Sequence, residues 1–170
     1  QFIGGNPLSA KHSSIGGGKN NSIFTQACYS KIGGGIDNKI CLGSSCSTLG
    51  GGCLNTVSSV FASVVGGKSN TAGACGVFIG GGGNNSTTAN SANSSIVGGA
   101  NNCDLTNAGC GENFIGGGNN NINHNYTFRN VITGGFNNIT KYIAYATIGG
   151  GNNNTICSGG AGNVTAGGRV

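Results

Sequence analysis

A short glycine motif recurs along the entire chain and constrains its fold more than any other feature. The motif is one apolar or small residue followed by two to four glycines. Full copies begin at Ile15, Ile32, Leu49, Val65, Ile79, Val97, Ile115, Thr133 and Ile148, with partial copies at Ile3 and Ala166. Ten intervals cover the 163 residues from Ile3 to Ala166, which is 16.3 residues per repeat. A period of this length predicts a solenoid of stacked coils.

The residues around each motif keep a fixed phase. An asparagine follows the first motif residue by six positions in the triple-glycine copies (Asn21, Asn38, Asn55, Asn121, Asn154) and by five where only two glycines are present (Asn70, Asn102, Asn138). We interpret the shorter spacing as the loss of one glycine from a turn. An apolar residue follows two positions later (Ile23, Ile40, Val57, Ile156), and a serine precedes the motif by two (Ser13, Ser30, Ser47, Ser63, Ser95). A disordered Gly/Asn-rich tract would keep no such phase.

Each repeat has room for two short strands and two turns. We therefore predict an all-β fold, a parallel β-solenoid (β-roll or β-helix) of about ten rungs with 14–18 residues per rung, formed by residues 1–170 as one repeat domain. Two ladders are expected, since the same residues stack from rung to rung. The apolar ladder is Ile15, Ile32, Leu49, Ile79, Ile115 and Ile148, and the amide ladder is Asn21, Asn38, Asn55, Asn121 and Asn154.

The composition excludes most other classes of protein. The 170 residues include 37 glycines and only 11 charged residues, 8 Lys+Arg and 3 Asp+Glu, which is far below the ~25% of an ordinary soluble domain. Few strong helix formers are present, and the single proline rules out collagen. No apolar run is long enough to cross a bilayer, and the scattered cations predict no nucleic-acid partner.

Few apolar residues are available in each rung, so one chain encloses little core. We expect copies of the chain to supply the missing burial, as a homotrimer packed along a common axis, as an end-to-end filament, or as both. Chains meeting at the glycine runs would explain why no side chain is present there. A single-chain β-helix with its glycines only in turns is the alternative. Both ends stop inside a repeat without a capping element, and Gln1 follows no recognisable leader, which indicates an excerpt, a removed signal or subunits that stack end to end.

The I-G-G-G-x-x-N-x-I copies resemble the GGG-x-x-N repeats of shaft and head regions in phage, giant-virus and bacterial surface fibres. More distantly, they are similar to the β-roll heads of trimeric autotransporter adhesins. The resemblance covers Ile3 to Gly168 and implies a homotrimeric, elongated fibre that is extracellular or lies on a cell or virion surface. The longer rung, the glycine triplets and the cysteines depart from the adhesin heads.

The chain offers little that could carry catalysis. Among the acids, Asp104 and Glu112 share a rung but Asp37 is about four rungs away, and His12 and His124 are about seven rungs apart. A calcium β-roll needs an Asp in each repeat where this chain has Asn. We therefore predict no enzymatic activity, catalytic residue, metal site or cofactor.

Eight cysteines, an even number, favour an oxidising compartment. Cys28 and Cys46 lie at similar places on neighbouring rungs and are candidates for a disulfide. Cys41 with Cys46, or Cys103 with Cys110, could instead close a loop within a rung. Cys53, Cys75 and Cys157 have no obvious partner and could link chains. Several cysteines could alternatively be buried thiols that act as small apolar residues.

Glycosylation is a further hypothesis. The N-x-S/T sequence occurs at Asn20, Asn84, Asn85, Asn93, Asn125, Asn138, Asn153 and Asn163.

These features favour a structural role as the rigid shaft of a fibre or filament. The alternative is an adhesin, a fibre segment that binds a surface glycan or receptor. Its candidate residues are the two segments that depart most from the consensus, 123–129 and 141–145, which carry Tyr126 and Tyr142. Ice binding is a third hypothesis, but no Thr-x-Thr row runs through the rungs.

Overall fold

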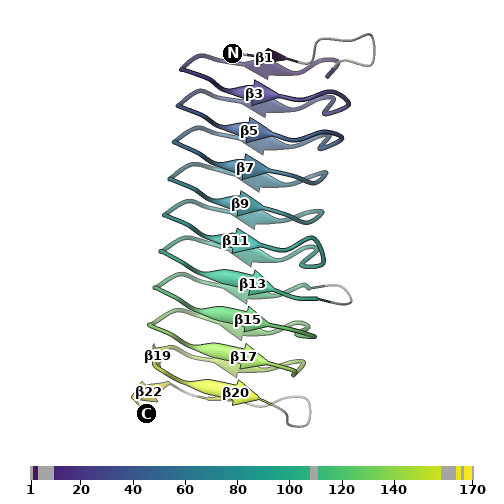
Figure 1. The fold of residues 1–170 in the computed structure, drawn as a ribbon. Coiled ribbons are helices and arrows are strands. Elements are labelled where there is room, and N and C mark those ends of the chain that lie inside the picture. Colours follow the sequence, from purple (N-terminus) through teal and green to yellow (C-terminus); the bar gives the residue numbers. More distant parts are fainter. Residues whose placement is uncertain (1, 4–9, 108–110, 158–163, 166, 170) are drawn as a thin grey trace.

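The computed structural model describes residues 2–3, 10–107, 111–157, 164–165 and 167–169. Within these ranges every regular element is a β-strand, and the chain winds as a stack of similar coils along one axis, from β1 at the top of Figure 1 to β20 at the bottom. All strand pairs are parallel. The predicted parallel β-solenoid is therefore confirmed.

Two ten-stranded sheets run along the solenoid. The β1–β20 sheet contains β1 (Phe2–Ile3), β3 (Ser22–Ile23), β5 (Lys39–Ile40), β7 (Thr56–Val57), β9 (Thr71–Ala72), β11 (Ser86–Thr87), β13 (Cys103–Leu105), β15 (Ile122–His124), β17 (Ile139–Lys141) and β20 (Thr155–Cys157). The β2–β21 sheet contains β2 (Ser14–Ile15), β4 (Lys31–Ile32), β6 (Thr48–Leu49), β8 (Ser63–Val64), β10 (Phe78–Ile79), β12 (Ser95–Ile96), β14 (Phe114–Ile115), β16 (Val131–Ile132), β18 (Thr147–Ile148) and β21 (Val164–Thr165). A small third sheet pairs β19 (Gly151–Asn152) with β22 (Gly168–Arg169).

The two edges of the solenoid differ in how much their length varies. We call the turn that contains the glycines and the ladder asparagine the narrow edge, on the left in Figure 1, and the longer connection back to the β2–β21 sheet the wide edge, on the right. One coil spans 15 residues from Leu49 to Val64 and 19 from Ile96 to Ile115, against a predicted range of 14–18. The narrow edge always has the same length, so all of this variation lies in the wide edge.

An apolar ladder on the inner face of the β2–β21 sheet forms the main core. Its members are Ile15, Ile32, Leu49, Val64, Ile79, Ile96, Ile115, Ile132 and Ile148, all of them fully buried except Ile15, which is partly buried. Every residue predicted for the apolar ladder lies on it. The β-branched side chains stack at the strand-to-strand spacing of ~4.8 Å.

The register corrects one interpretation of the repeat. Val64, Ile96 and Ile132 occupy the ladder, and Val65, Val97 and Thr133 follow them in the position that other coils fill with the first glycine. Copies with two glycines have therefore exchanged a glycine for a side chain and have lost no residue. Counted from the ladder, every asparagine lies six positions later. Because of the same shift, Ser63 and Ser95 do not occupy the place of Ser13, Ser30 and Ser47.

The inner face of the β1–β20 sheet changes character along the axis. Ile23, Ile40, Val57 and Ala72 form its first part, and Thr87, Asp104, Asn123 and Thr140 continue the same ladder before Ile156. All nine side chains are buried. The hydrophobic core is divided accordingly, with one cluster from Ala10 to Ile115 and another that contains Ile132, Ile143 and Ile156.

The glycine three positions after each apolar-ladder residue is fixed by the coil next to it. Gly99 has a φ of +83°, a left-handed conformation that glycine adopts without strain. A Cβ on Gly99 would also overlap the carbonyl oxygen of Gly118 in the next coil, and the equivalent glycines have the same geometry. The middle glycine, as at Gly98, meets no atom within 4 Å. The positive φ and the neighbouring coil therefore account for the invariant glycine without a second chain at this position.

Candidate functional site

The asparagine ladder joins every described coil to the next at the narrow edge. Asn102 shows the pattern: its Nδ2 donates to the carbonyl oxygens of Gly98 (2.9 Å) in its own coil and Gly118 (3.1 Å) in the next. Its Oδ1 accepts the backbone N–H of Asn121 at 2.9 Å. The ladder consists of Asn21, Asn38, Asn55, Asn70, Asn85, Asn102, Asn121, Asn138 and Asn154, all of them buried. It includes the five predicted members and Asn85, which sequence reasoning missed although it lies six residues after Ile79.

The polar part of the β1–β20 ladder forms a buried hydrogen-bond network inside the coils. Thr106 Oγ1 donates to Asp104 Oδ1 at 2.7 Å, and Asn113 Nδ2 lies 3.2 and 3.3 Å from the two carboxylate oxygens. Thr106 and Thr127 hydroxyls are 3.1 Å apart. Desolvation by burial raises the pKa of Asp104, while these hydrogen bonds partly oppose the shift. Burial therefore favours the neutral carboxylic acid at this position.

Two buried nitrogens beside this network have no hydrogen-bond partner. Asn123 lies level with Asp104 on the ladder; its Oδ1 accepts from Thr140 Oγ1 at 2.5 Å, but its Nδ2 is unsatisfied. His124 Nδ1 is also buried and unsatisfied. Unpaired buried polar atoms reduce stability, so the polar interior is less favourable than a fully satisfied one.

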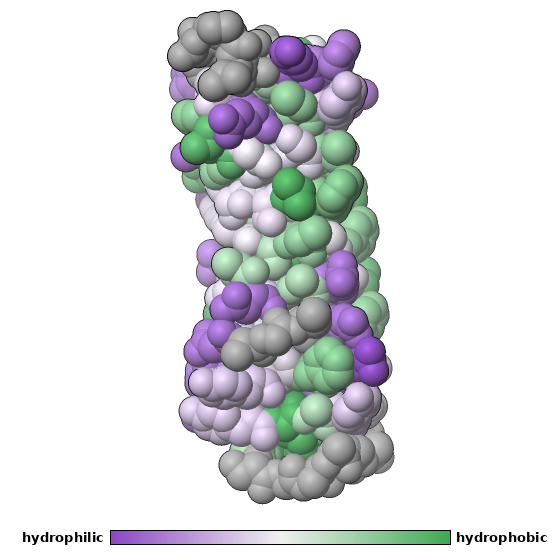
Figure 2. Space-filling model, turned by 90° about the vertical axis from the view of Figure 1, so that its right-hand side faces the viewer, coloured by the Kyte–Doolittle hydropathy of each residue, from purple (hydrophilic) through white to green (hydrophobic). Residues whose placement is uncertain are grey.

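The two irregular segments predicted as binding residues lie side by side at the wide edge, which faces the viewer in Figure 2. Tyr126 and Tyr142 stack with ring centroids 6.1 Å apart, and Asn125 Nδ2 donates to the Tyr142 hydroxyl at 3.2 Å. Lys141 Nζ lies over the Tyr142 ring, 5.2 Å from its centroid. Tyr126 is 62% exposed, so a stacked aromatic pair is open to solvent.

An ionic and aromatic network adjoins this pair. Arg129 Nε donates to Glu112 Oε2 at 2.6 Å, and this hydrogen bond together with the attraction to Glu112 raises the pKa of the guanidinium. The same guanidinium lies 4.5 Å from the Phe128 ring centroid and 5.8 Å from that of Tyr145. Because Arg129 is held on both sides, Phe128 and Tyr145 form an ordered extension of the Tyr126–Tyr142 pair.

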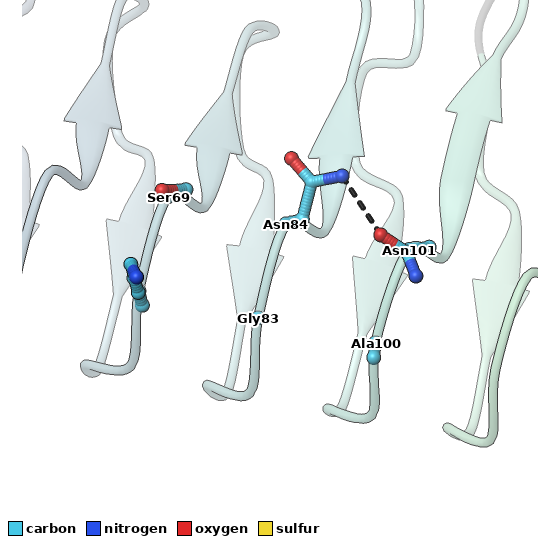
Figure 3. A pocket seen from close by; sticks show the side chains of 6 residues that line it. Ser69, Gly83, Asn84, Ala100 and Asn101 are labelled. Carbon is cyan, nitrogen blue, oxygen red and sulfur yellow. Dashed lines mark hydrogen bonds between the residues drawn. The ribbon is translucent and has the colours of Figure 1, made fainter.

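A shallow hollow lies on the narrow edge, between Lys68, Ser69, Gly83, Asn84, Ala100 and Asn101 (Figure 3). Asn84 Nδ2 donates to Asn101 Oδ1 at 2.8 Å across two coils. Small residues at positions 83 and 100 leave the floor open, and the lining carries one cation and several amide and hydroxyl groups. No acid, histidine or cysteine is among these six residues.

The predicted separation of the acids and histidines is seen in the structure. Asp104 is enclosed inside the solenoid, whereas Glu112 is paired with Arg129 on the outside. His12 stacks on Tyr29 with ring centroids 4.9 Å apart, several coils from His124. Within the described ranges, no three His, Cys, Asp or Glu side chains gather into a possible metal site. In the same residues no helix is long and apolar enough to span a membrane.

None of the candidate disulfides is closed. Cys46 is a free cysteine, which leaves both the Cys28–Cys46 and the Cys41–Cys46 pairs unformed. Cys46 has the same left-handed φ of 56° as Tyr29, so it is level with Tyr29 and one residue out of register with Cys28. Cys103 is also free, and Cys110 lies outside the described residues. Cys53, Cys75 and Cys157 are free as well.

The glycosylation candidates fall into two structural groups. Asn85 and Asn138 belong to the buried ladder, and each Nδ2 already makes two hydrogen bonds, so a glycan there is incompatible with the folded chain. Asn20, Asn84, Asn93 and Asn153 are exposed, and Asn125 is half-buried. Asn163 lies outside the described residues.

No protein-family model matches the chain, and no curated protein matches it in sequence.

Proposed function

We propose that this chain is a structural building block of an extracellular or virion-surface fibre, in which stacked coils form a rigid shaft. One observation carries the proposal: the asparagine ladder links coil to coil without interruption from Asn21 to Asn154. Each coil contacts mainly its neighbours, so the arrangement extends along one axis. A ladder of this kind resists bending and supports a role in extension.

The location and the partners form part of the same proposal. The extracellular or surface location rests on the fibre resemblance and on exposed N-x-S/T sites such as Asn20 and Asn93. The partners are copies of the chain, as a homotrimer or an end-to-end filament.

Negative-stain electron microscopy together with light-scattering mass, in non-reducing buffer, tests the shaft proposal. We expect straight rods of uniform width whose length is a multiple of one chain. Small-angle scattering of the same sample should give an elongated particle. Compact or irregular particles at all concentrations would contradict a shaft role.

A second function, binding of a surface glycan, is favoured by the aromatic pair at the wide edge. Segments 123–129 and 141–145 come from successive coils, and together they present Tyr126 and Tyr142 beside Asn125 and Lys141. An exposed aromatic ring packs against the apolar face of a sugar ring, while neighbouring amide and ammonium groups bind its hydroxyls. A shaft with such a patch would also act as an adhesin.

Glycan-array binding of the wild type and of Tyr126→Ala and Tyr142→Ala tests this second function. Tyr29→Ala is the matched control, because Tyr29 is also exposed at the wide edge, has a left-handed φ and stacks on a ring, that of His12. We expect binding to fall at least about tenfold in the first two variants and to remain in the control. Equal binding by all three variants would exclude the patch as the glycan site.

A further inference from the structure

The outer face of the β2–β21 sheet carries an unusual row of exposed apolar side chains. In successive coils Val65, Phe78, Val97, Phe114 and Val131 point away from the core, one from each coil, and we call this set the apolar strip; the first four are exposed and Val131 is half-buried. Four spacings of ~4.8 Å make the strip about 19 Å long. In Figure 2 this face is seen edge-on along the right-hand margin, which is largely green over the middle coils.

Folding does not require these side chains. Val65 and Val97 are 56% and 47% exposed, and they stand where most coils have glycine. Phe78 and Phe114 are 39% and 37% exposed, and they stand where other coils have serine, as at Ser63 and Ser95. Because the same fold forms with glycine and serine at these positions, the apolar side chains serve something other than the core.

The outer surface of the sheet along the strip is also flat. Each strand of this sheet has one outward residue before its apolar-ladder residue, the first outward position, and one after it, the second. Where the first position is Phe, the second is Gly, and a Cβ added to Gly80 would lie 3.4 Å from the Phe78 ring. Phe114 lies over Gly116 in the same way, at 3.3 Å. Where the second position holds Val65 or Val97, the first holds a serine. In these four coils large and small residues therefore alternate across the sheet, which suits packing against another flat sheet, whereas the next coil has Val131 and Thr133 at the two positions.

The distribution of charge points to the partner. The chain has a net charge of +5, so two copies repel one another unless they meet where cations are absent. Outward positions of the β2–β21 sheet carry no charged residue from Thr48 to Gly149, whereas the β1–β20 sheet presents Lys39 and Lys141. Lys19 and Lys68 lie on the narrow edge. Lys31 is an exposed outward residue of the same sheet, on β4 two coils before Val65, so the strip lies within the uncharged stretch from Thr48 to Gly149.

The area of the uncharged face fits a weak, reversible self-association, at the low end of interface sizes. Seven strands, from β6 to β18, spaced at ~4.8 Å and with flanking turn residues, give a face of about 29 Å by 15 Å, roughly 430 Å². A standard interface buries about 800 Å² on each partner, with an apolar centre and a polar rim. The apolar strip is flanked along the axis by Thr48 and Thr147, which fits this anatomy.

We propose that the apolar strip is the lateral contact between copies of this chain, a second copy packing its own β2–β21 sheet against the first. This inference rests on the shaft proposal and names the surface through which two shafts associate side by side. An identical flat face on another solenoid matches both the uncharged surface and the ~4.8 Å repeat. The strands already have hydrogen-bonded neighbours on both sides within the sheet, so the contact is made by side chains.

Sedimentation velocity and light-scattering mass over a range of concentrations test the proposal. The double variant Phe78→Ser/Phe114→Ser introduces the residue that the chain itself uses at Ser63 and Ser95. The matched control is Ile122→Ser/Ile139→Ser, which removes two outward apolar residues from the other sheet. We expect the wild type and the control to form dimers, and the strip variant to dissociate at least about ten times more readily.

Val97→Lys, a charge at the centre of the strip, provides a second variant if the serine variant does not fold. It should be monomeric, with the circular dichroism of the wild type. A wild type that stays monomeric at every concentration, or one whose self-association survives both strip variants, would overturn the proposal. Rods one chain wide in the microscope would do so while leaving the shaft proposal intact, whereas compact particles would overturn the shaft proposal itself.

Discussion

The two halves of the solenoid share one backbone conformation, but the inward residues of the β1–β20 sheet are apolar in the first half and polar in the second. From β3 to β9 the inner face of the β1–β20 sheet is Ile23, Ile40, Val57 and Ala72, whereas from β11 to β17 it is Thr87, Asp104, Asn123 and Thr140. Strand pairing continues across the change without a shift in register. An apolar interior on this sheet is therefore unnecessary for the coil to form.

Three features are common to both halves and explain why the coil survives the change. The apolar ladder of the β2–β21 sheet continues through Ile96, Ile115 and Ile132, the asparagine ladder has no gap, and the glycine three positions after each apolar-ladder residue keeps its left-handed φ. The polar half replaces the lost apolar packing by hydrogen bonds such as Asn130 Nδ2 to Thr140 Oγ1 (3.1 Å). The comparison indicates that the narrow edge and one ladder specify the fold, and the second ladder is variable.

The largest expected effect comes from a feature that both halves need. Gly35→Ala in the apolar half and Gly118→Ala in the polar half place a methyl group at a left-handed φ (+90° and +82°) and against a carbonyl oxygen of the next coil. Each should lower the free energy of unfolding by about 4 kcal/mol or more, measured by denaturant titration. Gly34→Ala and Gly98→Ala, where a Cβ has room, should stay within about 0.5 kcal/mol. A tolerated Gly118→Ala would show that the halves differ at the narrow edge as well.

Exchanging the two interiors should harm both. Val57→Thr puts a hydroxyl among apolar neighbours, and Thr140→Val leaves Asn123 Oδ1 and Asn130 Nδ2 each without one hydrogen bond. We expect each isosteric change to cost about 1–3 kcal/mol in thermal or chemical unfolding. If Thr140→Val were instead stabilising, the polar network would contribute nothing to the fold.

Only the polar half should make stability depend on pH through a buried acid. Asp104 has a pKa raised above 3.8 by desolvation, so its contribution to stability is full below pH 3.8 and is lost as the pH rises through the folded-state pKa. Melting temperatures measured from acid to neutral pH should fall over this window in the wild type. Asp104→Asn should remove that fall, and Asp37→Asn, on the surface of the apolar half, should retain it. An unchanged profile in Asp104→Asn would mean that the carboxyl is ionised without penalty.

The smallest effect is expected for the exposed amides next to the ladder. Asn84 Nδ2 donates to Asn101 Oδ1 at the surface, where water replaces a lost bond, so Asn84→Ala should change the free energy of unfolding by no more than about 0.5 kcal/mol. Asn85→Ala, one residue later on the buried ladder, loses three hydrogen bonds and serves as the reference. Similar unfolding curves for the two variants would contradict the distinction between surface and ladder amides.

The repeat was sufficient to predict the parallel solenoid and most of the asparagine ladder, because glycine and asparagine meet backbone requirements that recur in every coil. The phase at Val65, Val97 and Thr133 was wrong, since either of two adjacent β-branched residues fits the ladder by type and only strand pairing decides between them. The polar ladder was missed because Thr87, Asp104 and Asn123 have the composition of surface residues. The neighbouring Tyr126 and Tyr142 were both identified, but their stacking depends on a coil length that the sequence pattern left uncertain.

The contrast between the two edges of a coil also bears on how such a chain changes over generations. In every described coil the narrow edge has the same number of residues between the apolar ladder and the next strand. An insertion there would therefore shift the ladders out of register. At the wide edge coils of 15 and 19 residues coexist within one molecule. Insertions can therefore accumulate at the wide edge while the length of the narrow edge stays constant. The wide edge is thus a suitable position for grafting a foreign peptide and displaying it at regular spacings along the rod.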